Sequence, residues 1–449
     1  MPLMSEDIWD YQDNFRYDEP PIDPDDPRWV ELGGARGDYD RNELWNQLRY
    51  DAKARRLRGD PRGQCTLIGG HRGCGKSTEL RVLARGLERP QAYVVVQVDA
   101  LRDLDIFHLT YGDLLLAMVA ALAERLSRLS LSLDQVYVQP VQDWFLVRTE
   151  AIEQTRSLAA EASAGVDASA GLPLIAKLFA RLTAAIKTNT SYRETLQRQV
   201  RDGFGDLAKT FDDLIGHALD RVRQANHGRA ILFVVDGLDR LLPEDADRFF
   251  VEGVDQLRLL RVPNLLICAP IRTLIEKSQV SQTYEGYFKV PMVKLDSKDG
   301  RERFEEARAA LREFLTHRLP ERFFDDSDLL NVYIDHCGGH PRDLLRLINL
   351  SFTLLHDEST LTHQIAERAF RKMVDEYQNL VQPDDYAELR RIDAAPPSYR
   401  PMTDRNRRLL YDLVLLEYNA TWWRSHPAVR ASDAYQAGGS VTAADDEGR

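Results

Sequence analysis

Residues 69–80 read GGHRGCGKSTEL, and this stretch decides the fold. Residues 70–77 match the phosphate-loop pattern G-x-x-x-x-G-K-[ST] at every defined position. The preceding CTLIG (65–69) predicts a buried strand, and the following STELRVLARGLE (77–88) has apolar residues at helical spacing. Strand, glycine-rich loop and helix in this order predict a site for a nucleoside triphosphate.

The chemistry of such a loop gives each part of it a role. The glycines let the backbone turn so that its N–H groups point at the β-phosphate, Lys76 reaches the β- and γ-phosphates, and Ser77 ligates Mg²⁺. The dipole of the following helix adds to the anion site. A glycine-rich turn without a ligand is the alternative. The candidate nucleotide-binding residues of the loop are Gly70, His71, Arg72, Gly73, Cys74, Gly75, Lys76, Ser77 and Thr78.

A second apolar run, AILFVVD (230–236), ends in Asp236. A carboxylate at the end of such a strand can hold Mg²⁺ beside Ser77, and Asp239 can polarise the attacking water. Capping aspartates in a D-G turn are the alternative for both residues. The N/T-K-x-D pattern by which GTPases read guanine does not occur in the sequence, so ATP is the expected nucleotide.

The organisation of the chain predicts the α/β fold class. Further apolar runs at 93–99, 264–269 and 287–295 predict a parallel sheet with crossover helices. Lys76 and Asp236 are 160 residues apart, whereas two βαβ units need only about 60–70, which indicates a helical insertion. The expected parts are an acidic irregular arm (1–32), a P-loop NTPase core (33–300, insertion about 101–225), an all-helical lid (301–395), a winged-helix-like unit (396–432) and a disordered tail (433–449).

Composition narrows the functional classes. The net charge of -12 argues against a chain that coats nucleic acid indiscriminately. No apolar run approaches 18 residues, so no transmembrane helix is expected, and the N-terminus lacks a signal-peptide pattern. The four widely spaced cysteines predict free thiols in a cytoplasmic protein.

These motifs together resemble those of AAA+/STAND-type P-loop ATPases, the group that includes NACHT proteins and origin-recognition ATPases. DGLD (236–239) is similar to the STAND form of the acidic motif, in which a glycine follows the aspartate. LGGARGDYDRNELWNQL (32–48) loosely resembles the segment that flanks adenine in these families, with Arg36 and Tyr39 as its candidates.

Two further stretches resemble the motifs that sense the γ-phosphate. ICAPIRTL (267–274) places Arg272 where the family carries its first sensor, and a surface arginine is the alternative. GGHPRDLLRLI (338–348) resembles the lid motif, with Pro341 in its turn and Arg342 as the second sensor. A helix that begins with proline is the alternative there.

The resemblance implies an Mg-ATP-binding, slowly hydrolysing molecular switch that controls its own assembly or a partner effector protein. Analogy at the family level adds bacterial stress or antiviral defence. Gly237 stands where most AAA+ enzymes have a glutamate, which favours slow hydrolysis. The expected catalytic residues are Lys76, Asp236, Asp239, Arg272 and Arg342, and the expected metal ligands are Ser77 and Asp236.

Other classes of function stay open. An ATP-dependent DNA-binding loader, resembling origin-recognition or transposition ATPases, would use the arginines and tryptophans of residues 401–430. Packing of these tryptophans inside the protein is favoured, because the excess of basic residues is small. A nucleotide-bound scaffold without useful hydrolysis and a small-molecule kinase are the remaining alternatives.

Overall fold

The computed structural model describes residues 5–17, 21, 25–106, 109–147, 190–271, 284–356, 358–419 and 421–437. The chain divides into two compact units. We call the first the lid unit, which comprises Met1–Arg41, Gly70–Val82 and Lys289–Arg449, and the second the sheet unit, which comprises Asn42–Gly69 and Leu83–Phe288. In this division the phosphate loop groups with residues 289–449, and the expected domain bounds stay a prediction.

A five-stranded sheet forms the centre of the sheet unit and confirms the expected α/β class. Its strands lie in the order β4-β5-β6-β3-β7, and the pairs β4–β5 and β5–β6 are parallel. The strand that leads into the phosphate loop, β3, is separated from β5 by β6 alone. The strands are β3 (Cys65–Gly70), β4 (Tyr93–Asp99), β5 (Ala230–Asp236), β6 (Asn264–Pro270) and β7 (Gly286–Lys289).

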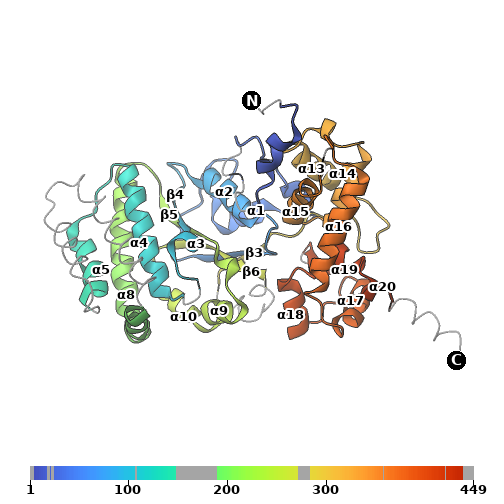
Figure 1. Ribbon diagram of the computed structural model, residues 1–449. Coiled ribbons are helices and arrows are strands. Elements are labelled where there is room, and N and C mark those ends of the chain that lie inside the picture. Colours follow the sequence, from blue (N-terminus) through green and yellow to red (C-terminus); the bar gives the residue numbers. More distant parts are fainter. Residues whose placement is uncertain are drawn as a thin grey trace. The chain divides into compact units, whose positions relative to one another are not determined.

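The strands form where the sequence has continuous Val, Ile and Leu, because both faces of this sheet are covered. Every residue of β3 and β6 is buried, and so are six of the seven residues of β5. In Figure 1, α4 and α8 run beside each other next to the sheet. The capping box of Thr110 and Asp113 starts α4.

Helices surround this sheet and fill the described part of the expected insertion. They are α1 (Arg41–Gln47), α2 (Lys76–Leu87), α3 (Ala100–Asp103), α4 (Tyr111–Arg128), α5 (Gln135–Val147), α8 (Thr190–Gln224), η3 (Leu238–Arg240), α9 (Pro243–Asp247), the π-helix η4 (Arg248–Glu252) and α10 (Val254–Leu257). A two-stranded ladder precedes the main sheet, with β1 (Tyr50–Asp51) antiparallel to β2 (Arg56–Leu57). Residues 148–189 of the insertion lie outside the described residues.

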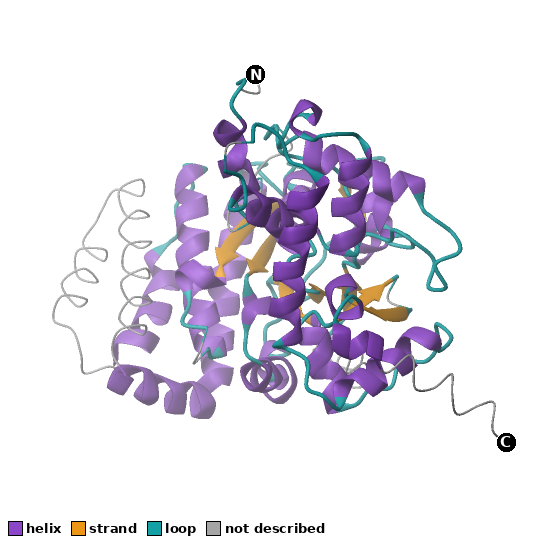
Figure 2. Ribbon diagram, turned by 45° about the vertical axis from the view of Figure 1, so that its right-hand side comes forward, coloured by secondary structure: helices purple, strands orange, loops and turns teal. Residues whose placement is uncertain are grey.

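Helices dominate the described chain (Figure 2), and they make up the elements of the segment at 301–395 that was expected to be all helical. Successive helices from α13 to α16 contact one another. The antiparallel hairpin β8–β9 follows, with Leu415 opposite Ser425. The elements are η1 (Ile8–Phe15), η2 (Gly33–Arg36), α13 (Glu305–Thr316), η5 (Glu321–Phe323), α14 (Asp328–Cys337), α15 (Pro341–Phe352), α16 (His363–Gln378), α17 (Asp385–Ala394), α18 (Asp404–Tyr411), β8 (Leu415–Tyr418), β9 (Trp422–Ser425), α19 (Pro427–Arg430) and α20 (Asp433–Ala437).

Two segments of the lid unit differ from the expectation. The strand expected at 287–295 ends at Lys289, because Val293 and Lys294 donate their N–H groups to Gly339 and Ala35, outside the sheet. The arm expected to be irregular contains η1, whose buried Phe15 lies with its ring centroid 5.9 Å from that of Phe352. An apolar side chain every three or four residues gives this arm a face that packs on α15.

The cysteines Cys65, Cys74, Cys268 and Cys337 are all buried free thiols, as expected. Among the described helices, none has the length and apolar character needed to cross a lipid bilayer.

Candidate nucleotide site

The phosphate loop joins β3 to α2 in the way that the motif predicts. Gly73 and Gly75 have φ values of +83° and +99°, which residues with a side chain rarely adopt, so glycine is required there. The ammonium group of Lys76 is almost fully buried and donates to the carbonyl oxygens of Gly70 (3.1 Å) and His71 (2.7 Å). The lysine therefore lies across its own loop, with the N-terminus of α2 beginning at the same residue.

Arg36, a candidate for the adenine-flanking segment, supports this loop from η2. Its guanidinium donates to the carbonyl oxygens of Cys74 (2.6 Å) and Pro291 (2.5 Å), and its side chain is buried. The Cys74 thiol is buried as well and lies 3.4 Å from the carbonyl oxygen of Val290. Charge-assisted bonds of this kind each contribute about 1.5–3 kcal/mol, so Arg36 fixes the far side of the loop. A contact of Arg36 with adenine stays a prediction.

The other adenine candidate, Tyr39, is bonded to the first turns of α2. Its hydroxyl donates to Glu79 (2.7 Å), which also accepts from Arg41 at 2.5 and 2.9 Å. Burial and the Glu79 carboxylate raise the pKa of Tyr39. The Arg41–Glu79 ion pair therefore holds the segment that contains Tyr39 and Arg41 against α2, the helix that follows the phosphate loop.

The lid motif meets the phosphate loop at Gly73. A Cβ atom at this glycine would lie 2.6 Å from Cβ of Arg342 and 2.7 Å from Nε2 of His340, so the loop backbone is in direct contact with the start of α15. Pro341 is the first residue of this helix, where its missing N–H group is tolerated. The structure thus brings the predicted sensor Arg342 to the predicted phosphate site.

His71 connects the loop to the C-terminal elements of the lid unit. Glu417 donates its backbone N–H to Nε2 (2.8 Å), so Nδ1 carries the proton and donates to the carbonyl oxygen of Leu410 (3.1 Å). Burial, together with the charges of His340 and Lys76, holds the pKa of His71 well below its usual range. The neutral ring is therefore the form that satisfies both partners.

We expect this neutral histidine to make the protein sensitive to acid. The unfolded chain takes up the proton near pH 6.5 and the folded chain only at lower pH, so thermal stability falls as the pH drops below about 6.5. In His71→Gln the amide oxygen can still accept the hydrogen bond from the backbone N–H of Glu417, but the side chain at this position no longer takes up a proton. Melting temperatures between pH 8 and 5 should fall less steeply in this variant than in the wild type or in the exposed control His356→Gln. Parallel curves for all three proteins would contradict the assignment.

The acidic motif lies at the end of β5 in the sheet unit. Asp236 accepts the N–H of Gly237 at 2.8 Å, and both Asp236 and Asp239 are partly exposed. Their carboxylate oxygens and the buried thiol of Cys268 all lie within 4.8 Å of one another. Mg²⁺ prefers oxygen ligands, so the two carboxylates fit it and the thiol does not. The structure therefore brings Asp236 and Asp239 together, as their predicted roles require.

The backbone conformation at position 237 favours glycine. Gly237 has φ +91° and ψ −8°, and a Cβ there would lie 3.1 Å from Cγ of Leu101. We expect Gly237→Ala to destabilise the protein by about 1–2 kcal/mol, the cost of a left-handed conformation. Gly216→Ala is the matched control in calorimetry, because a Cβ at this helical glycine has nothing within 4 Å. An equal change in both variants would show that the conformation at Gly237 carries no strain.

Several predicted features fall elsewhere. Arg272 lies outside the described residues.

Trp422 and Trp423 are buried, with 5% and 0% of their surface exposed. The expectation that they pack inside the protein is therefore confirmed, and neither ring offers a face on which a nucleic-acid base could stack. His340, Asp343 and His426 meet in one buried cluster that the sequence analysis did not predict, because 83 positions separate Asp343 from His426.

The arginines of α18 already have acidic partners. Arg408 contacts Asp385 at 2.5 Å, and Arg405 contacts the same carboxylate at 3.6 Å. Arg407 pairs with Asp404 at 3.0 Å. These pairs compensate much of the positive charge that a phosphate backbone would need.

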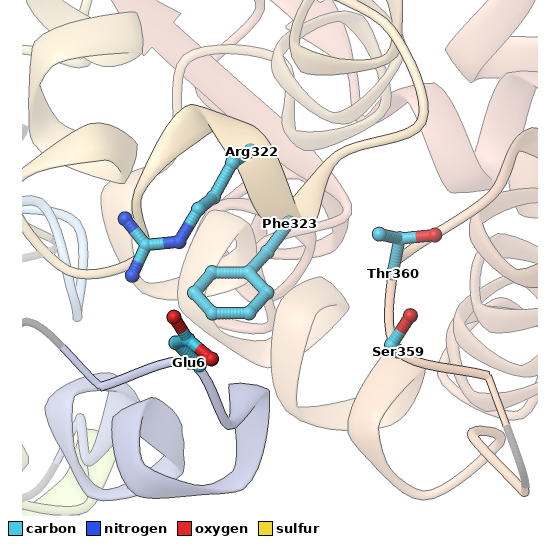
Figure 3. A pocket seen from close by; sticks show the side chains of 5 residues that line it. All are labelled: Glu6, Arg322, Phe323, Ser359 and Thr360. Atoms are coloured by element: carbon cyan, nitrogen blue, oxygen red, sulfur yellow. The ribbon is translucent and has the colours of Figure 1, made fainter.

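A separate surface pocket of about 480 Å³ lies where the N-terminal arm meets the lid helices (Figure 3). Arg322, which lies next to Phe323, donates to the carbonyl oxygen of Ser5 at 2.5 Å. Glu6 lies below these two side chains, with Ser359 and Thr360 on the opposite side. None of the predicted nucleotide-binding residues lines this pocket, so it does not belong to the phosphate site.

Comparisons with solved structures include distant similarities to ATPases and origin-recognition proteins. No family model and no curated protein matches the chain. An Orc1 protein of Aeropyrum pernix, solved in complex with DNA, is 13% identical with a TM-score of 0.39, over 96% of this chain and 98% of that one. A Walker-type ATPase of Pyrococcus abyssi is 13% identical with a TM-score of 0.33, over 91% of this chain and 95% of that one. Cdc6p of Pyrobaculum aerophilum is 13% identical with a TM-score of 0.32, over 91% of this chain and 97% of that one.

Proposed function

We propose that the chain binds Mg-ATP at residues 70–78, hydrolyses it slowly, and works as an AAA+/STAND-like switch. The observation that carries this proposal is the phosphate loop itself. Its lysine lies over the loop backbone, and the same loop contacts the lid at Gly73 and the C-terminal hairpin through His71. A change in the phosphates bound there is therefore transmitted to two other parts of the lid unit.

In this proposal each motif residue has a distinct task. Lys76 neutralises phosphate charge, Ser77 and Asp236 hold Mg²⁺, and Asp239 orients the attacking water. Arg342 reads the presence of the γ-phosphate from its place beside Gly73. The switch would control self-assembly or a separate effector protein, and bacterial stress or antiviral defence is the setting that we propose by analogy.

Affinities for ADP and for a non-hydrolysable ATP analogue test the sensing role. Arg342→Ala should lower the affinity for the ATP analogue about tenfold while ADP binding changes little, because one charged contact is lost. Arg371→Ala, at an exposed position of α16 in the lid unit, is the control arginine. Equal loss for both nucleotides would assign Arg342 to general binding and not to sensing.

The alternative function, an ATP-dependent DNA-binding loader, predicts that the chain binds DNA. Salt-sensitive binding of duplex DNA that disappears when Arg405, Arg407 and Arg408 are changed to Gln would support it. Our proposal predicts no such binding at low salt, because these side chains are paired and the tryptophans are buried.

A further inference from the structure

A buried polar cluster lies behind the phosphate loop and has no part in the roles assigned so far. Its members are His340, Asp343 and His426, each with 0% of its surface exposed. His340 directly precedes α15, Asp343 lies in the first turn of that helix, and His426 is the N-cap of α19. Burying a charged group destabilises the folded state unless the group has hydrogen-bond or ion-pair partners. The partners of these three residues therefore indicate the role of the cluster.

His340 bridges the loop and the lid helix. Its Nε2 lies 2.8 Å from the carbonyl oxygen of Arg72, and its Nδ1 lies 3.2 Å from Oδ2 of Asp343, close enough for an ion pair but without hydrogen-bond geometry. A carbonyl oxygen can only accept a hydrogen bond, so Nε2 donates to the loop. The ring therefore lies between the loop backbone and a buried carboxylate.

Asp343 is itself held from several sides. Arg346 donates to Oδ1 at 2.7 Å, the Tyr377 hydroxyl donates to Oδ2 at 2.5 Å, and Nε2 of His426 lies 3.2 Å from Oδ2. Burial alone would raise the pKa of this carboxyl, but His340 and His426 hold it well below its usual range. The carboxylate is therefore a fixed anchor for His340.

The bond to Arg72 sits next to the contact between Gly73 and Arg342. We propose that His340, anchored by Asp343, is a positioning residue that holds the phosphate loop through the Arg72 carbonyl and so keeps Arg342 beside Gly73. This inference rests on the proposed nucleotide site. It adds to that site the residue that sets the distance between the phosphate loop and Arg342.

A metal ion does not suit the same three residues. Nδ1 of His426 accepts the N–H of Ala428 at 3.1 Å, so the proton is on Nε2, the atom that faces Asp343. A protonated nitrogen has no lone pair for a metal. The Tyr377 hydroxyl also occupies the shared carboxylate oxygen.

Two substitutions separate the hydrogen bond of His340 to Arg72 from its contact with Asp343. The amide nitrogen of Gln reaches the place of Nε2, so His340→Gln can keep the bond to Arg72, whereas that of Asn reaches the place of Nδ1, so His340→Asn keeps only the contact with Asp343. The readout is the ratio of affinities for a non-hydrolysable ATP analogue and for ADP. We expect this ratio to fall about tenfold in His340→Asn and less than about threefold in His340→Gln, since one hydrogen bond to the loop separates the two variants.

Equal ratios in the wild type and both variants would overturn the proposal, and so would a larger loss in His340→Gln. Melting temperatures show whether each variant folds. If His340→Asn does not, Asp343→Asn replaces it, because the loss of the anchor should lower the ratio in the same direction.

Hydrogen exchange in the nucleotide-free protein keeps this test separate from the proposed function. Amides of residues 71–75 should exchange faster in His340→Asn than in His340→Gln, whatever the protein binds. Faster exchange without any nucleotide affinity in the wild type would retain the clamp and refute the nucleotide site. Unchanged exchange beside normal ATP binding would refute the clamp alone.

Discussion

Lys76→Ala should abolish ATP binding, with a loss of affinity of about a hundredfold or more. The ammonium group lies over the carbonyl oxygens of Gly70 and His71, where the β- and γ-phosphates of a bound nucleotide are expected. A hundredfold corresponds to about 2.7 kcal/mol, a moderate value for a charge pair shielded from water. Titration calorimetry with Mg-ATP measures the effect directly.

The exposed Lys53 provides the matched control for this experiment. Lys53→Ala removes the same charge from the sheet unit and should bind ATP like the wild type. Melting temperatures of both variants show whether either loses its fold. Wild-type affinity in a folded Lys76→Ala protein would mean that residues 69–80 form a turn without a ligand.

Asp239→Asn should reduce ATP turnover by about a hundredfold and leave ATP binding close to the wild type. Its carboxylate lies beside that of Asp236 after the end of β5, and we propose that it orients the attacking water from there. The amide keeps the shape and removes the charge that polarises water. Single-turnover hydrolysis, compared with nucleotide affinity in the same variant, separates chemistry from binding.

The same experiment decides between a slow switch and a scaffold that never hydrolyses ATP. Asp245→Asn, in α9 nearby in the chain, is the control and should turn over ATP like the wild type. No turnover above background in the wild type itself would favour the scaffold, in line with the glycine at position 237. Turnover that survives in Asp239→Asn would exclude this residue as the group that orients water.

The sequence predicted the parts of the structure that depend on local pattern. The strands at 93–99 and 230–236 have the expected bounds, because their branched apolar residues are buried on both faces of the sheet. The turn from strand to helix at 70–77 is also confirmed, since its glycines allow the backbone conformation within eight residues, and nucleotide binding there stays a prediction.

What the sequence missed depends on contacts between distant residues. The apolar run at 290–295 has the pattern of a strand. Its backbone N–H groups nevertheless donate to the carbonyl oxygens of Gly339 and Ala35 and do not pair with a neighbouring strand of the sheet. His71 counted as a generic loop position, whereas its ring bonds to Leu410 and Glu417, more than 300 residues away. Neither partner carries a pattern that a single sequence could match to the loop.

Solution mass by light scattering, with ADP and then with a non-hydrolysable ATP analogue, tests the proposed switch most directly. Wild type and Lys76→Ala are measured side by side. Our account predicts a larger particle with the ATP analogue alone, and no change in the variant under either condition. An unchanged mass of the wild type with both nucleotides, at concentrations that saturate the site, would contradict control of self-assembly by the phosphate loop.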